Sequence, residues 1–144
     1  MTRTPPSESE VYIDGASRGN PGPAGVGIVC LDGTAQPLWR FSKYLGQTTN
    51  NVAEYLALIY ALQEAWRRDC RRLIIKTDSE LLTRQMSGQY RVRDAQLRLL
   101  HDVATHLREG FAHCAIVHVP RTANTLADRL AGEAVVTATG LPTT

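Results

Sequence analysis

Four acidic residues stand at positions that ordinary folding does not explain well. Asp14 lies inside a strand-like segment, although Asp is depleted in strands. Glu54 falls in the first turn of a predicted helix, Asp78 ends a short apolar segment, and Asp128 lies beside the apolar stripe of another predicted helix. Taken singly, these residues could start a turn, complement a helix dipole, end a strand or face solvent. Their joint placement favours a chemical role.

The four carboxylates indicate a divalent-metal site. If the strands that carry Asp14 and Asp78 are neighbours, their ends form a crevice of the kind in which α/β sheets bind ligands. Two helices can then bring in Glu54 and Asp128. Four carboxylates cannot all ionise in one site without cations, because their repulsion would keep some of them protonated. Oxygen ligands favour magnesium or manganese, and two such ions about 3.5–4 Å apart can support phosphodiester cleavage.

Hydrophobic periodicity and turn residues predict the elements that must position these carboxylates. Alternation of apolar residues predicts strands, and apolar spacing of three and four residues predicts helices. The expected strands cover residues 11–17, 24–31, 37–45, 72–78 and 112–120. The expected helices cover residues 51–68, 79–86, 94–108 and 123–138. Thr49 or Asn50, Ser79 and Asp94 are the expected N-caps. This order predicts an α/β fold with a mixed sheet covered by helices on both faces.

Length and composition are those of one soluble globular domain. The chain has 144 residues, 43% of them hydrophobic, and no apolar run approaches the length of about 20 residues that spans a bilayer. We expect a disordered tail over residues 1–9, one domain over 10–138 and a second tail over 139–144. The polar, Pro-rich start is unlike a signal peptide, so we expect a cytoplasmic location. We also expect a monomer that does not bind a membrane. The net charge of +2 excludes no partner.

The chain resembles the type I ribonuclease H family in four blocks that stand in the family's order: VYIDGASRGNPGPAGVGIV, TTNNVAEYLALIYAL, IIKTDSELL and NTLADRLAGEA. The resemblance covers roughly residues 10–138. It implies a ribonuclease H-like fold with a five-stranded mixed sheet, whose first three strands are antiparallel. It also implies hydrolysis of the RNA strand of RNA/DNA hybrids, which leaves a 3′-hydroxyl and a 5′-phosphate. Asp14, Glu54, Asp78 and Asp128 match the family's catalytic metal ligands, which would hold two Mg²⁺ ions that Mn²⁺ can replace.

The resemblance also implies which residues read the substrate. Asn20, Asn50 and Asn51 would contact the minor groove and the 2′-hydroxyls of the RNA, and Thr49 would help to hold a phosphate of the DNA strand. The chemistry is suitable, because amides can donate to and accept from the 2′-hydroxyl that distinguishes RNA from DNA. The structural alternatives are a turn residue for Asn20 and a helix cap for Thr49 and Asn50.

Two departures from the family pattern concern basic residues. Many members carry a His in a loop before the last carboxylate, whereas residues 120–127 contain none, and Arg121 is the nearest replacement by position. His118 lies in a predicted strand, where we expect it to be packed. Members with a basic handle have an additional helix between the positions of Gln85 and Leu97. Its absence here is typical of the handle-less branch, as in archaeal and some bacterial members. The basic residues left near the expected groove are Arg84, Arg91 and Arg93.

Two other functions remain open on the sequence. One is an integrase-like or DNA-directed nuclease with the same fold, and the polar cluster at Asn20 and Thr49–Asn51 argues against it. The other is an inactive module that binds hybrids. The intact set of four carboxylates argues against this second function, because negative charges beside phosphate would only weaken binding.

Overall fold

The computed structural model describes residues 8–31 and 36–140. The elements follow the predicted order, with one short 3₁₀ helix added before the last helix. They are β1 (Ser9–Ser17), β2 (Gly22–Leu31), β3 (Pro37–Thr48), α1 (Asn50–Arg67), β4 (Arg72–Thr77), α2 (Glu80–Met86), α3 (Ala95–Glu109), β5 (His113–His118), η1 (Arg121–Ala123) and α4 (Thr125–Thr139). Most of the two predicted tails lies outside the described residues, while β1 begins at Ser9 and α4 ends at Thr139.

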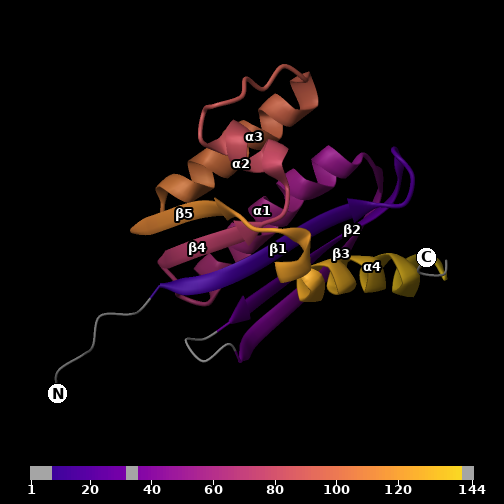
Figure 1. The fold of residues 1–144 in the computed structure, drawn as a ribbon, viewed down its shortest axis with the longest axis horizontal. Coiled ribbons are helices and arrows are strands. Elements are labelled where there is room, and N and C mark those ends of the chain that lie inside the picture. Colours follow the sequence, from indigo (N-terminus) through magenta and orange to yellow (C-terminus); the bar gives the residue numbers. More distant parts are fainter. Residues whose placement is uncertain (1–7, 32–35, 141–144) are drawn as a thin grey trace.

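The five strands form one mixed sheet in the order β3-β2-β1-β4-β5 (Figure 1). β1 pairs with β2, and β2 with β3, in antiparallel fashion, whereas β4 runs parallel to both β1 and β5. The predicted five-stranded sheet with three antiparallel leading strands is therefore confirmed. β1 is the central strand of the sheet, with the antiparallel β2 on one side and the parallel β4 on the other.

The helices cover both faces of this sheet, as predicted. The register pairs Asp14 with Gly27, and Gly15 with Val26, so neighbouring residues of β1 point to opposite faces. Gly27 lies directly under the backbone of α4, and Gly15 lies under the backbone of α1. The main apolar core fills the space between the sheet, α1 and α3, around Tyr55. Figure 1 shows α4, in yellow, against β1, β2 and β3, apart from α1, α2 and α3.

Side-chain caps determine where three helices begin. The side chains of Thr49, Ser79 and Asp94 accept hydrogen bonds from the backbone N–H groups three residues later, at 3.2, 3.1 and 2.9 Å. Each bond satisfies one of the N–H groups that a helix start leaves without a partner. The predicted caps Ser79 and Asp94 are confirmed, and Thr49 rather than Asn50 caps α1. The start of α1 matters most, because Glu54 lies in its second turn.

The segment between α2 and α3 is a loop over residues 87–94, which matches the expected lack of a handle. Tyr55 helps to hold it, because its hydroxyl donates to Gln85 Oε1 at 2.6 Å, and Gln85 Nε2 donates to the carbonyl of Arg91 at 3.5 Å. Within the described residues, no helix has both the length and the apolar character needed to cross a membrane.

One expectation about packing was wrong. His118 is exposed, not packed, because it is the last residue of an edge strand.

Candidate active site

The end of β4 brings Asp14 and Asp78 together. The parallel pairing of β1 with β4 stops at Ile13 and Thr77, and each of the two aspartates directly follows one of these residues. Beyond this point the pairing of the two strands ends, so both aspartates lie at the carboxyl end of β4. The sequence argument required β1 and β4 to be neighbours, and the sheet order meets this condition.

Glu54 joins the two aspartates from α1. The backbone N–H of Gly15 lies past the last β1–β4 pairing, and it donates to Glu54 Oε1 at 2.8 Å. A Cβ atom at Gly15 would lie 2.1 Å from the carbonyl oxygen of Ala53. Only glycine lets β1 approach the first turns of α1 this closely. The backbone at Gly15 therefore both admits the helix and orients the carboxylate.

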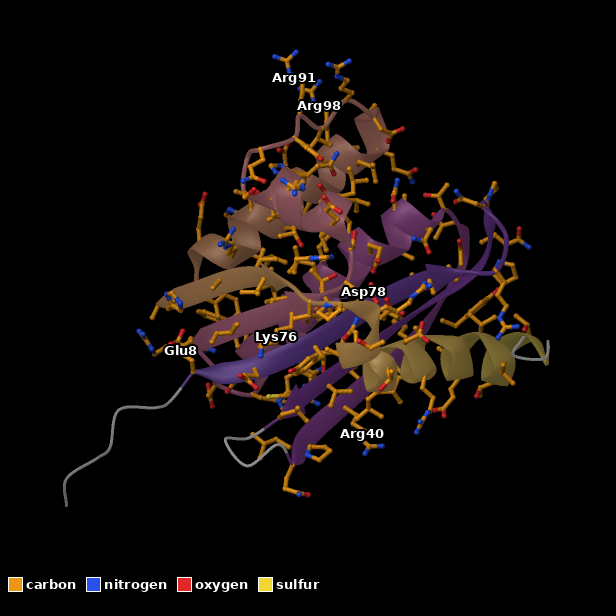
Figure 2. The ribbon with its side chains drawn as sticks, in the orientation of Figure 1. Glu8, Arg40, Lys76, Asp78, Arg91 and Arg98 are labelled. Atoms are coloured by element: carbon orange, nitrogen blue, oxygen red, sulfur yellow. The ribbon has the colours of Figure 1, made fainter. Side chains whose placement is uncertain are left out.

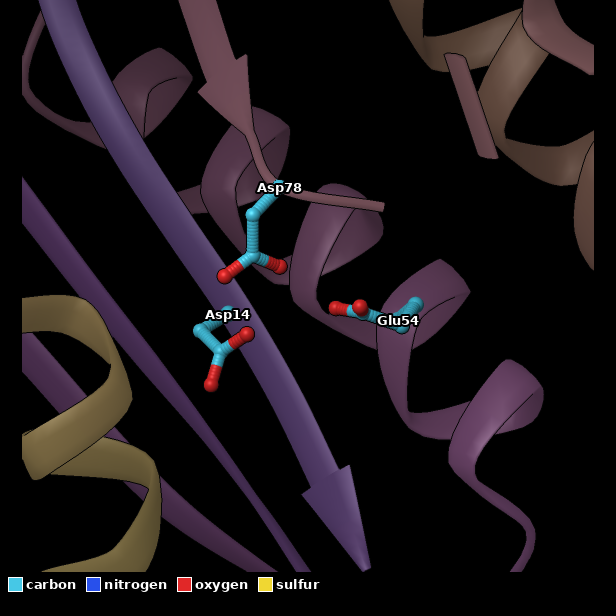
Figure 3. Close-up of side chains that lie close together, drawn as sticks. All are labelled: Asp14, Glu54 and Asp78. Atoms are coloured by element: carbon cyan, nitrogen blue, oxygen red, sulfur yellow. The ribbon is translucent and has the colours of Figure 1, made fainter. Parts of the chain in front are cut away.

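Three of the four predicted carboxylates form a tight cluster, which we call the carboxylate cluster: Asp14, Glu54 and Asp78 (Figure 3). One oxygen of each lies within 4.8 Å of the others. Asp14 and Glu54 are buried, and Asp78 is half-buried. The fourth carboxylate, Asp128, stands outside this group and is exposed on the first turn of α4. It still lies near enough to Asp14 to contribute to the raised pKa of that carboxyl.

Burial and mutual repulsion raise the proton affinity of the cluster. Loss of hydration is the largest cause, followed by the charges of Glu54 and Asp78, and together they raise the pKa of Asp14 to about 9. Burial likewise raises the pKa of Glu54 to about 8, although the N–H of Gly15 and the charge of Arg121 act in the opposite direction. Without a cation, the cluster therefore retains protons near neutral pH.

These features suit a hard divalent cation. Asp14 Oδ2 is fully buried and lacks a hydrogen-bond partner among the described residues, and an unpaired buried carboxylate oxygen is costly. A cation would satisfy this oxygen, and its charge would offset both the lost hydration and the repulsion that raise the two pKa values. The donors are all oxygens, which is the set that magnesium, calcium and manganese prefer.

A groove of about 810 Å³ leads away from Asp128. It lies between the turn after β1 and the outer side of α4, and it contains two guanidinium groups that the sequence argument did not single out, Arg18 and Arg129. Arg129 directly follows Asp128, and this position in the sequence could have identified it as a candidate site residue. Arg121 lies close enough to Glu54 to lower its pKa through charge. The predicted replacement for the loop His thus stands beside the carboxylates.

The polar residues predicted to read the substrate meet at the start of α1. Asn20 Oδ1 accepts a hydrogen bond from the backbone N–H of Asn50 at 3.0 Å, which links the turn after β1 to the helix. Asn20, Asn50 and Asn51 are exposed. The hydroxyl of Thr49 is engaged in capping α1, in line with its structural alternative. Sequence reasoning did not single out Gly15, whose N–H donates to Glu54 of the carboxylate cluster.

Comparisons with known proteins identify relatives over most of the chain. Residues 12–134 match the family described as reverse transcriptase-like. The ribonuclease HI of Halobacterium salinarum is 43% identical over 86% of this chain, which spans 62% of that relative's length. A crystal structure of RNase H1 from the same archaeon superposes with a TM-score of 0.88 at 40% identity, and the match covers 91% of this chain and 99% of the other.

A second solved structure contains a nucleic acid. LC11-RNase H1 in complex with an RNA/DNA hybrid has a TM-score of 0.86 and 39% identity, and the match covers 91% of this chain and 99% of the other.

Proposed function

Because this chain belongs to the type I ribonuclease H family, we propose that it is an endoribonuclease that hydrolyses the RNA strand of RNA/DNA hybrids. The observation that carries the proposal is the carboxylate cluster, in which side chains from β1, from α1 and from the residue after β4 offer oxygens within 4.8 Å of one another. The products are a 3′-hydroxyl and a 5′-phosphate. The hybrid bound to LC11-RNase H1 supports the substrate class.

Two Mg²⁺ ions, which Mn²⁺ can replace, would be held by the four carboxylates of Asp14, Glu54, Asp78 and Asp128. When bound, these ions supply the activation of water and the stabilisation of the leaving oxygen. The chain contributes the geometry: Gly15 orients Glu54, and the burial of Asp14 makes its carboxylate a strong ligand once the proton leaves. Arg121 adds positive charge near the cluster, where it can stabilise a phosphate.

The surface around the start of α1 selects RNA. Asn20, Asn50 and Asn51 contact the minor groove and the 2′-hydroxyls of the RNA strand, and Thr49 lies where a phosphate of the DNA strand passes. The contact between Asn20 and Asn50 supports this arrangement, because it holds two of the readers together. A hybrid with 2′-O-methyl groups on its RNA should therefore resist cleavage at the modified positions, since the modification removes the hydroxyl donor.

One assay tests the proposal. Purified protein is given an RNA/DNA hybrid, a DNA duplex or an RNA duplex, each with magnesium and each with EDTA. We expect cleavage of the hybrid alone, and only with magnesium. Equal cleavage of the DNA duplex would favour a DNA-directed nuclease, and binding of the hybrid without cleavage would favour an inactive binding module.

The proposal also specifies the bounds of the catalytic domain, its oligomeric state, its location and its mode of hybrid binding. The catalytic domain covers residues 10–138 and acts as a monomer in the cytoplasm. Its affinity for hybrids does not depend on a basic handle.

A further inference from the structure

We propose that Asn124 is a positioning residue, which holds Asp128 and Arg121 in place beside the carboxylate cluster. The inference rests on the proposed function, because it concerns the geometry of the same site. Asn124 lies between η1 and α4, and only 1% of it is exposed.

The side chain of Asn124 joins the start of α4 to β1. Its Nδ2 donates to the backbone carbonyl of Ile13 at 2.8 Å, across 111 positions of the sequence. That carbonyl belongs to the peptide bond that leads into Asp14. The bond is buried, so water does not compete for either partner. The position of α4 along β1 is thereby tied to the strand residue that precedes the most buried ligand.

The backbone of Asn124 contacts the two other residues concerned. Its N–H donates to the carbonyl of Arg121 at 3.0 Å, and its carbonyl accepts from the N–H of Asp128 at 3.1 Å. Asn124 is therefore hydrogen-bonded to β1 through its side chain, and to Arg121 of η1 and Asp128 of α4 through its backbone. Glu54 and Asp78 reach the cluster on other elements and do not depend on this junction.

The side chain of Asn124 makes this tertiary contact instead of capping α4. Asn before a helix usually accepts a hydrogen bond from an N–H of the first turn. The side chain of Asn124 forms no such cap, and its buried Oδ1 has no partner among the described residues. A residue that breaks a local rule in favour of a tertiary contact is typical of functional sites. The contact it makes instead is the one to Ile13.

Loss of this bond should weaken the contribution of α4 to the site, while the fold persists. Two substitutions remove it: Asn124→Ala, which leaves a gap, and Asn124→Leu, which fills a similar volume. Ser42→Ala is the matched control, because Ser42 Oγ also joins α4 to the sheet, through a 2.8 Å bond to the carbonyl of Leu130. Ser42 belongs to β3 and has no part in the site.

The test uses the free protein as well as its activity. Calorimetric titration with magnesium should show affinity reduced by about tenfold in both Asn124 variants, as is usual when a group that orients a metal ligand is lost. In the same variants, kcat should fall by about tenfold while KM for the hybrid stays within about twofold. The magnesium-induced NMR shift of the Asp128 carboxyl carbon should shrink. Ser42→Ala should match the wild type in all three.

Two results would overturn the proposal. If Asn124→Leu folds and binds magnesium within about twofold of the wild type, Asn124 has only a structural role. The same holds if neither variant folds. A wild-type protein that binds magnesium without cleaving hybrids would contradict the proposed function instead, and the titration would still decide the role of Asn124.

Discussion

The carboxylate cluster and a group of arginines at the opposite end of α2 differ in burial as well as in charge. Arg91, Arg93 and Arg98, which we call the arginine corner, are exposed and line a hollow of about 580 Å³. Within residues 8–31 and 36–140, no carboxylate forms an ion pair with any of the three. Figure 2 shows Arg91 and Arg98 at one extremity of the molecule, away from Asp78.

The difference between the two regions is one of solvation. In the cluster, charges that have lost their hydration repel one another, and the pKa values of Asp14 and Glu54 rise as a result. At the arginine corner, like charges stay hydrated and salt screens them. Substitutions in the cluster should therefore change catalysis and the pH dependence of stability strongly, whereas substitutions in the corner should change affinity modestly and in a salt-dependent way.

The largest effect is expected for Asp14→Asn. Cleavage of the hybrid in saturating magnesium should fall to less than about a tenth of the wild-type rate, because the variant lacks a buried ligand. The melting temperature without metal should hold or rise, because the substitution removes repulsion from Glu54 and Asp78. Steady-state kinetics and thermal unfolding in EDTA measure the two quantities. A variant that cleaves well, or that melts well below the wild type, would show that Asp14 has another role.

The stability of the metal-free protein should depend on pH. The pKa of Asp14 is raised from 3.8 to about 9 and that of Glu54 from 4.5 to about 8, so the folded state holds more protons than the unfolded state. The free energy of unfolding must then decrease as the pH rises, and this part of the stability is lost once the pH passes about 8–9.

Melting temperatures in EDTA between pH 5 and 9 test this sign. Other groups titrate as well, so Asp14→Asn is the control, and the difference between the two proteins isolates the cluster. We expect the wild type to lose stability relative to Asp14→Asn as the pH rises, and saturating magnesium to abolish the decline. A difference that does not vary with pH would mean that Asp14 is ionised in the metal-free protein.

A smaller effect is expected for Arg121→Ala. Arg121 lies near Glu54 but is itself exposed, so its contribution to turnover should be roughly 1 kcal/mol, or about fivefold in kcat. The affinity for the hybrid should change less than kcat. Unchanged kinetics would show that Arg121 is a solvated loop residue. Arg40→Ala, on the exposed side of β3, is the control for the loss of one positive charge.

The smallest effect is expected at the arginine corner. The structure changes the set of arginines that are candidates for binding phosphate. Arg84 is paired with Glu80 at 2.8 Å and lies over Tyr90, whereas Arg98 lines the same hollow as Arg91 and Arg93. Two to four phosphate contacts would give a slope of log affinity against log salt of magnitude about 1.4–3.6. Replacing Arg91 and Arg93 together by Ala should reduce that magnitude by about 1.4–1.8, because each contact contributes about 0.7–0.9.

Hybrid titrations at several salt concentrations, with an Asp78→Asn background in calcium to prevent cleavage, measure the slope. Single-turnover cleavage at saturating enzyme should stay nearly unchanged in the double variant made without the Asp78 substitution. A wild-type slope steeper than about 5, or a slope that does not respond to the loss of both arginines, would place the binding surface elsewhere.

Local interactions explain what the sequence alone could predict. Helix starts depend on a side chain and an N–H group three residues apart, so Ser79 and Asp94 could be recognised as caps without a fold. Strand and helix types follow from the spacing of apolar residues, and all five strands were expected in the correct order. The four sequence blocks were enough to identify the family, and with it the candidate carboxylates.

Tertiary packing decided how these residues relate to one another. Asp128 lies on the exposed first turn of α4, outside the cluster, and His118 is exposed because β5 is the edge strand of the sheet that the described residues form. Gly15 and Asn124 gain their importance from partners 39 and 111 positions away, Glu54 and Ile13. No local pattern encodes such contacts, because they form only when β1 lies between α1 and α4. The sequence therefore identified the candidate metal ligands, whereas only the folded sheet determined the distances between them and their proton affinities.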